Sequence, residues 1–145
     1  MTNYKTKEIG ELHGLSQYVF APEGAGIRLE GKIFLADLLG ITSMEISLNK
    51  NAAGTGMEFF HKHTNHEEIY LFLAGEGEMN IDGETVLVRE GTIVNLKPEA
   101  VRSWWNTGKT DLIYIVMQAP INGMKATALE DGQILDGKVP WSKVA

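Results

Sequence analysis

Cysteine is absent from this chain of 145 residues, and the absence excludes several kinds of chemistry. Disulfide bonds, thiolate zinc sites and cysteine nucleophiles are ruled out, so only histidine, carboxylate or backbone oxygen could hold a metal ion. Long apolar runs are missing too: no stretch approaches the roughly 18 residues of a membrane span, and the N-terminal segment lacks the apolar core of a secretory signal. We therefore expect a cytoplasmic protein without a membrane partner.

Basic residues are the minority among the charged residues. Thirteen Lys and Arg stand against 19 Asp and Glu, which gives a net charge of −6. No basic stripe interrupts this balance, and the sequence therefore argues against nucleic acid as a partner. The length fits one domain, and 43% hydrophobic with 22% charged residues is typical of a globular protein. We expect the chain to fold alone around a single core.

Helical periodicity is nearly missing, and short β-rich segments take its place. From Lys32 onward, segments rich in β-branched and aromatic residues recur about every ten residues with Gly, Asn or Asp between them, which predicts an antiparallel sandwich or barrel. The expected strands are 31–37, 42–49, 57–63, 68–74, 77–81, 84–89, 92–96, 101–106 and 111–118. Asp82-Gly83 predicts a two-residue type I′ hairpin turn, because both positions of that turn need a positive φ.

Three regions follow from this pattern. Residues 1–30 are expected to form an irregular N-terminal arm, because glycines and Pro22 break any period there. Residues 31–118 are expected to form the β-domain. Residues 119–145 lose the period again, and we expect them to form a C-terminal tail that packs on the barrel.

His61 and His63 lie in the alternating segment 57–63. In a strand, residues i and i+2 share a face, so both imidazoles would point the same way, about 7 Å apart. Glu68 would join them if the loop between the two strands lets those strands meet, and two His with one carboxylate can hold a metal ion with open positions. The alternative is an ordinary polar face. However, each unsatisfied buried polar group costs about 1 to 3 kcal/mol, and a shared cation would satisfy all three.

These residues resemble the conserved motifs of the cupin superfamily. The residues similar to the first motif are Gly56, His61, His63, Glu68 and Gly75, and those similar to the second are Gly91, Pro98, Val101 and Asn106. The resemblance covers about residues 31–118. It implies an all-β double-stranded β-helix, or jelly-roll, barrel, frequent dimerisation, and a divalent transition metal such as Fe, Mn, Zn or Ni. It also implies His61, His63 and Glu68 as the metal ligands, and the spacing to Gly75 selects Glu68 over Glu67.

The second motif departs from the family where a third histidine is usual. Aligning Asn106 places Arg102 at that position, and a guanidinium has no acceptor with which to bind a metal. A positive charge about 5 Å from a divalent cation would experience a repulsion of about 7 kcal/mol at an effective dielectric of 20. Arg102 could turn away, could be screened by Glu68 and a bound anion, or could pair with Glu68 in a site that binds metal weakly or not at all.

Strand alternation predicts the lining of the interior. Arg102 and Trp104 would share the inner face, whereas Trp105 would point outward to a dimer or arm contact. The expected substrate pocket is Met57, Phe59, Tyr70, Phe72, Arg102 and Trp104. Arg102, as an anion anchor, and Tyr70 are the candidate catalytic residues. His66 falls in the predicted loop and is expected to be a solvated residue more readily than a ligand.

Three functions remain open at this point. The first is a metal-dependent enzyme that acts on a small anionic organic molecule. The second is a barrel that binds or senses a small molecule without breaking a bond, and the third is a metal-free structural module in which Arg102 neutralises Glu68. In each case a homodimer is expected, because the apolar run 69–73 indicates burial on both faces of its strand.

Overall fold

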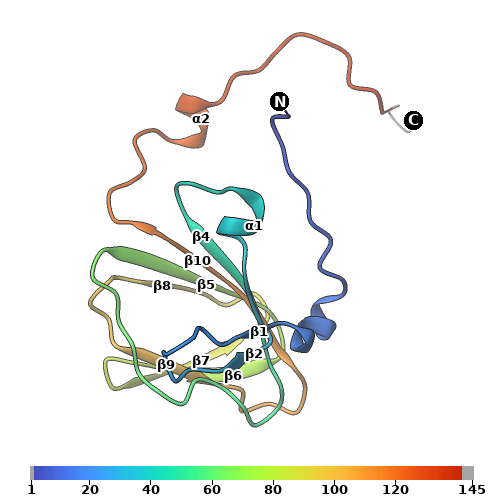
Figure 1. The fold of residues 1–145 in the computed structure, drawn as a ribbon. Helices are drawn as coiled ribbons and strands as arrows, with labels where there is room; N and C mark the ends of the chain where they lie inside the picture. Colours follow the sequence, from blue (N-terminus) through green and yellow to red (C-terminus); the bar gives the residue numbers. More distant parts are fainter. Residues whose placement is uncertain (1, 142–145) are drawn as a thin grey trace.

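The computed structural model describes residues 2–141, most of which lie in or beside two facing antiparallel sheets (Figure 1). The larger sheet has the strand order β3 (Lys32–Phe34), β4 (Glu45–Asn51), β10 (Leu112–Pro120), β5 (His66–Ala74) and β8 (Ile93–Leu96). The smaller sheet has the order β7 (Glu84–Arg89), β6 (Glu76–Ile81) and β9 (Arg102–Trp105). This is the all-β, double-stranded arrangement that the sequence predicts.

Short elements flank the two sheets. They are a 3-10 helix η1 (Leu12–Gln17), a two-stranded ribbon of β1 (Val19–Phe20) and β2 (Leu29–Glu30), and the helices α1 (Ala36–Leu39) and α2 (Ala128–Asp131). The N-terminal arm is attached to the larger sheet through η1, whose Leu15 is completely buried, and through a bond from Lys50 Nζ to the His13 carbonyl (2.7 Å). None of the helices in the described part of the chain has the length and hydropathy that a membrane crossing requires.

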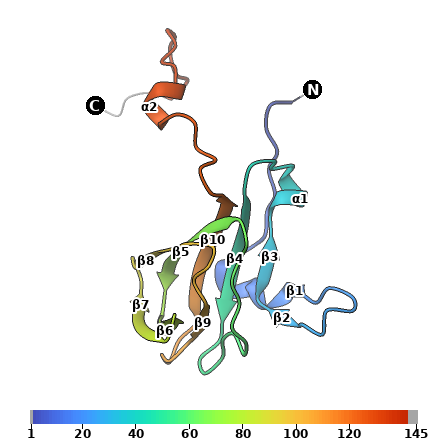
Figure 2. The ribbon, with the colours of Figure 1, turned by 90° about the vertical axis from the view of Figure 1, so that its left-hand side faces the viewer.

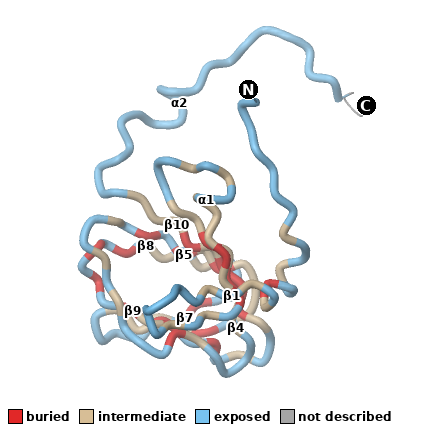
Figure 3. The backbone as a smooth tube through the Cα atoms, viewed as in Figure 1, coloured by how far each residue is buried: buried red, intermediate tan, exposed pale blue. Residues whose placement is uncertain are grey.

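The hydrophobic core lies between the two sheets. Its members from the larger sheet are Tyr70, Phe72, Leu96, Leu112, Tyr114 and Val116, and those from the smaller sheet are Met79, Val88 and Trp104. Figure 2 shows the two sheets from the side, and Figure 3 shows that the buried stretches follow the strands. Apart from Ile113, which is buried on the other face of β10, the residues between them are exposed or half-buried, because successive side chains of a strand point to opposite faces.

Two predicted backbone features explain how the chain moves between strands. Asp82 and Gly83 have φ values of +50° and +88°, which confirms the predicted type I′ turn between β6 and β7. Gly75 separates β5 of one sheet from β6 of the other, at φ +79°. A Cβ atom at Gly75 would lie 2.3 Å from the Asp111 carbonyl oxygen, so only glycine fits this crossing.

The expected strand at 57–63 is wrong. This segment pairs with β9 only at two isolated bridges, Gly56 with Trp105 and His61 with Arg102. Between the two bridges this segment advances by five residues, whereas β9 advances by only three. The segment therefore has two more residues than the strand opposite it, and it bulges outward there. Phe59 is 39% exposed and lies outside the core, and its ring stands 6.4 Å from that of His61. The expected strand 31–37 is also shorter than predicted, because α1 begins at Ala36.

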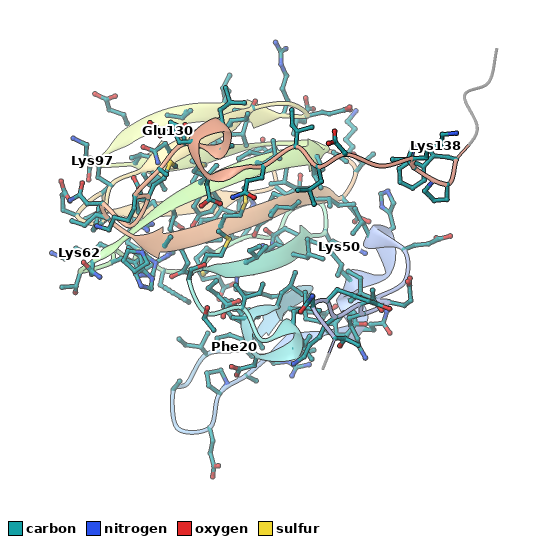
Figure 4. All side chains as sticks on the ribbon, turned by 90° about the horizontal axis from the view of Figure 1, so that it is seen from above. Phe20, Lys50, Lys62, Lys97, Glu130 and Lys138 are labelled. Carbon is teal, nitrogen blue, oxygen red and sulfur yellow. The ribbon has the colours of Figure 1, made fainter. Side chains whose placement is uncertain are left out.

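The tail extends away from the sheets. Residues 121–141 are all exposed; Figure 1 shows this part of the chain well apart from the strands, and Figure 4 shows Lys138 beyond the edge of the sheets. Within the described residues the tail therefore does not pack on the barrel as the sequence led us to expect. Its large apolar side chains in solvent are Ile121, Met124, Leu129, Ile134, Leu135, Val139 and Trp141.

Strand β4 has an inverted pattern. Its polar residues Ser47 and Asn49 face the interior and are each only 2% exposed, whereas Ile46 and Leu48 face outward and are half-buried. An ordinary half-buried strand places apolar residues inward. The interior beside β4 is therefore polar, and the outer face of the larger sheet is apolar.

Candidate functional site

Two histidines enter the interior from the irregular segment before β5. The backbone of His61 forms a reciprocal pair with Arg102 of β9: His61 N–H donates to the Arg102 carbonyl (3.1 Å), and Arg102 N–H donates to the His61 carbonyl (3.0 Å). His63 N–H donates to the Pro98 carbonyl (2.9 Å). The exposed Lys62 between them lies at one end of the sheets in Figure 4. Backbone bonds to β9 and to the segment that precedes it therefore hold both imidazoles in place without a regular strand.

The two imidazoles converge on Glu68 of β5. One ligand atom from each of His61, His63 and Glu68 lies within 4.8 Å of the others. His63 Nε2 contacts Glu68 Oε1, and His61 Nε2 lies 4.0 Å from the same oxygen. Glu68 is 2% exposed, whereas Glu67 is exposed, as the motif spacing predicts. Imidazole nitrogen and carboxylate oxygen suit a divalent transition metal, so the residues present fit such an ion.

The protonation state of His61 also suits metal binding. Burial, and next the positive charge of Arg102, lower the pKa of His61 to about 4. The imidazole is therefore neutral at pH 7, and a metal ion binds only the neutral ring. Buried His61 Nδ1 has no hydrogen-bond partner among the described residues.

Arg102 is completely buried beside these groups. Its Nη2 donates to Glu68 Oε1 (2.6 Å), and its Nη1 donates to the carbonyls of Ala100 (2.6 Å) and Pro98 (3.4 Å). Of the three arrangements that the sequence leaves open for Arg102, the structure excludes the one in which it turns away, because the guanidinium lies against Glu68 as the other two require. Arg102 Nε is buried without a partner among the described residues. The Nε–H of the guanidinium thus remains to bind an acceptor.

Aromatic side chains form the wall behind the three candidate ligands. Tyr70 is 1% exposed, and its ring lies 5.2 Å from that of Trp104, which in turn lies 5.8 Å from the ring of His61. Burial, and then the carboxylate of Glu68, raise the pKa of Tyr70 well above its usual value. Tyr70 therefore stays protonated and can act as a hydrogen-bond donor, but not as a base at neutral pH.

The other expected site residues are placed as follows. Met57 and Phe72 are buried in the core, and Trp104 is 4% exposed while Trp105 is 37% exposed, so their opposite orientations are as predicted. His66 begins β5 instead of lying in a loop. Its ring stacks on His63 at 6.1 Å, and its Nδ1 lies 2.9 Å from Gln118 Oε1. It lies outside the group of three candidate ligands.

Sequence reasoning missed a polar set that faces the same interior. It consists of Lys32, Ser47, Asn49, Asn51 and Tyr114. Lys32 Nζ donates to Asn49 Oδ1 (2.7 Å) and Ser47 Oγ (3.2 Å). The sequence signal was the alternation of polar and apolar residues over 45–51, which has the usual period of a strand with its polar face turned inward.

Comparisons with known proteins agree with this fold. Residues 48–118 match the family model described as Cupin domain. A cupin protein from Bacteroides fragilis has a similar structure, with 25% identity, a TM-score of 0.75, and coverage of 93% of this chain and 99% of that chain. No curated protein matches the sequence significantly.

Two further solved structures share the fold at lower identity. One is named as a predicted oxalate decarboxylase from Thermotoga maritima, with 23% identity, a TM-score of 0.59, and coverage of 72% of this chain and 91% of that chain. The other is a protein with a double-stranded β-helix domain from Klebsiella pneumoniae, with 19% identity, a TM-score of 0.55, and coverage of 76% and 90%. These structures share the fold, and together with the motifs the family model identifies residues 48–118 as a cupin domain.

Proposed function

We propose that this protein binds a divalent transition metal ion through His61, His63 and Glu68 and acts on a small anionic organic molecule beside it. The observation that carries the proposal is the convergence of the three donor atoms within 4.8 Å of one another in a largely buried site. A bound ion would supply Lewis-acid polarisation of a substrate oxygen. The membership of the cupin superfamily supports the same assignment.

The residues of the chain prepare this site for an anion. Arg102 fixes the Glu68 carboxylate through the 2.6 Å bond from its Nη2, so the carboxylate is held in one orientation. The Nε–H of Arg102 has no acceptor among the described residues and is available to an oxygen of an anionic ligand. Tyr70 stays protonated and adjoins Glu68, which supports a role as a hydrogen-bond donor to substrate.

Metal analysis tests the proposal directly. Protein purified without chelator or metal-affinity resin should hold about one equivalent of transition metal, and a His61→Ala/His63→Ala variant should hold less than about a tenth. His66→Ala is the matched control, because His66 stacks on His63 but lies outside the three candidate ligands, and it should keep the metal. Failure of the unmodified protein to load added Fe, Mn, Zn or Ni would rule out the metal site.

A metal-free function is the second candidate, and the ion pair between Arg102 and Glu68 supports it. If this pair and His63 already satisfy the carboxylate, the site needs no cation. Arg102→His separates the two candidates, because it offers a further imidazole where the family has a third histidine. Tighter metal binding by this variant supports the metal centre, whereas no metal binding in either protein supports the metal-free structural module.

Turnover of substrate separates an enzyme from a binding or sensing barrel. Arg102 and Tyr70 remain the candidate catalytic residues, Arg102 through its free Nε–H and Tyr70 through its protonated hydroxyl. For an enzyme, Tyr70→Phe should reduce kcat with less effect on substrate binding, because it removes a single donor. A ligand that binds the metal-loaded protein and is recovered unchanged would support the binding barrel. Cytoplasmic location stays a prediction.

We also propose a homodimer formed through the outer face of the larger sheet. Apolar residues of neighbouring strands pair across this face: Ile115 with Leu48 and Leu71, and Met117 with Ile46 and Ile69. A second copy is the occupant we favour, because each copy also carries the apolar tail. Twenty-one extended residues reach about 70 Å, whereas five strands span only about 20 Å, so one tail can cross the partner's sheet.

Light scattering after size-exclusion chromatography tests the dimer. The unmodified chain should elute with twice the mass of one chain, and Met117→Glu should shift it to the monomer. Glu84→Gln, a change at an exposed position of β7 in the smaller sheet, is the control and should leave the mass unchanged. A monomer at about 100 µM unmodified protein would contradict the proposal.

A further inference from the structure

A second cavity lies beside the candidate metal centre but is separate from it. It has a volume of about 200 Å³ and is formed by β3, the Asn51 end of β4, the segment 52–57, and inward side chains of β9 and β10. None of His61, His63 and Glu68 lines it. Trp104 both lines the cavity and stands 5.8 Å from the ring of His61, so the indole separates the two spaces.

Lys32 supplies a positive charge to this cavity without a carboxylate partner. Its Nζ donates to Asn49 Oδ1 and Ser47 Oγ, which leaves the third N–H without an acceptor among the described residues. The two carboxylates whose charges act on it are engaged elsewhere. Glu68 accepts from Arg102, and Glu45 Oε1 accepts from the backbone N–H groups of residues 35, 36 and 46.

The energetic balance around Lys32 favours a ligand over a purely structural role. Its burial, opposed only in part by Glu68 and Glu45, lowers the pKa of Lys32 to about 8, so the ammonium is still mainly protonated at pH 7. Besides its two hydrogen bonds, its nearest compensation is the face of the Phe34 ring, whose centroid lies 4.8 Å from Nζ, and no anionic group contacts it among the described residues. Apolar residues at positions 32 and 49 would be buried at a lower cost in free energy, because a buried charge is unfavourable unless it is paired. An anion in the cavity would offset that charge.

The other lining residues indicate which anion fits. The exposed charged side chains at the cavity are Arg28, which adds a positive charge, and Glu30, which offsets it; Lys50 is already paired with Asp111 at 3.2 Å. On the opposite side, the Tyr114 hydroxyl donates to Asn51 Oδ1 (2.8 Å).

Trp104 completes this wall with a bond of its own. Its Nε1 donates to the Tyr114 hydroxyl (2.6 Å). These polar atoms therefore satisfy one another, and the wall is left with ring faces and Met57 for an apolar ligand body.

We infer that this cavity is a second ligand site, in which Lys32 binds the carboxylate of a small organic monoanion and Trp104 and Tyr114 contact its apolar body. One free N–H suits a carboxylate better than a phosphate, whose three oxygens need more donors. The volume is below the roughly 300 to 1,000 Å³ of pockets that hold drug-sized molecules, so the ligand is of metabolite size. The site does not depend on the proposed metal centre.

Calorimetric titration with acetate, butyrate and benzoate tests this inference on the full chain, before and after treatment with chelator. At least one of these carboxylates should bind saturably with about 1:1 stoichiometry, and its neutral amide should not. Lys32→Met should weaken that binding about 10- to 100-fold, as expected for loss of a hydrogen bond to a charged group. Lys97→Met removes an exposed lysine and should change the affinity less than about twofold.

Two further variants separate this site from the metal centre and from misfolding. Lys32→Arg keeps the charge and should retain most of the affinity, so a loss confined to Lys32→Met is not a folding defect. His61→Ala/His63→Ala should leave carboxylate binding unchanged while it removes metal. The inference is overturned if none of the three carboxylates binds below about 10 mM. It is also overturned if binding survives Lys32→Met but is lost in the double histidine variant, which would place the anion at the metal.

Discussion

Replacing Lys32 with methionine should make the protein more stable, although it removes two hydrogen bonds. Burial lowers the pKa of Lys32 from 10.5 to about 8, and a shift of this size corresponds to about 3 kcal/mol of unfavourable free energy for the protonated side chain in the folded state. Loss of the hydrogen bonds to Asn49 and Ser47 lowers the stability by about 1 kcal/mol each. The net expected gain in the free energy of unfolding is about 1 kcal/mol at pH 7.

The stability of the unmodified protein and that of the Lys32→Met variant should also depend differently on pH. Below pH 8, Lys32 is protonated in both the folded and the unfolded chain, and the whole penalty is present. Between pH 8 and 10.5 the unfolded chain holds more protons, so the stability of the unmodified protein rises with pH, whereas the methionine variant lacks this rise. The free energy of unfolding of the variant relative to the unmodified protein should therefore fall by about 3 kcal/mol across the window.

Urea denaturation followed by tryptophan fluorescence from pH 7 to 10 measures both quantities. The buried tyrosines Tyr70 and Tyr114, whose pKa values are raised, contribute equally to both proteins and cancel in the difference. Lys97→Met is the control for loss of an exposed charge and should keep the pH dependence of the unmodified protein. The reasoning is refuted if Lys32→Met is clearly destabilising at pH 7 and its stability rises with pH as steeply as that of the unmodified protein.

Two further substitutions test other parts of the structure. Arg102→Met should lower the free energy of unfolding by about 3 to 5 kcal/mol at pH 7, because it leaves the Glu68 carboxylate buried without its cation; a loss below about 1 kcal/mol in urea denaturation would contradict the ion pair. Gly75→Ala should destabilise the protein much more than Gly91→Ala. Both glycines have a positive φ, but only at Gly75 would the added Cβ lie against the Asp111 carbonyl. Equal decreases in Tm for the two variants in thermal unfolding would show that the backbone at the crossing can relax.

The sequence predicted strands well where a turn signal and alternation of polar and apolar residues occurred together. Asp82-Gly83 combined a turn signal with flanking alternation, and the structure has the predicted turn and both neighbouring strands. The segment 57–63 shows the limit of this approach. Its alternation resembles that of a strand, but the five-against-three spacing of its two bridges to β9 depends on tertiary packing, which no local period reveals. The exposure of Phe59 was therefore not foreseen, whereas Arg102 and Trp104 face inward as expected.

Lys32 was missed for a different reason. Alternation alone does not say which face of a strand is inward, and no faces were assigned to the expected strands 31–37 and 42–49. In β4 the buried residues are Ser47 and Asn49, so the interior is polar on a side where no motif marks the inward face. The three candidate metal ligands could be named because the family motif fixes their spacing, whereas the lysine that faces the second cavity lies outside both motifs.

The projecting C-terminal segment gives a direct assay of assembly. Lys125 and Lys138 are exposed in the separated chain, so trypsin should clip the monomer quickly at both positions, while every strand, which all end by Pro120, stays intact. If two chains cover each other's segments, cleavage should slow as the protein concentration rises. A simple digestion series, read by mass spectrometry, would thus measure association without any label or immobilisation.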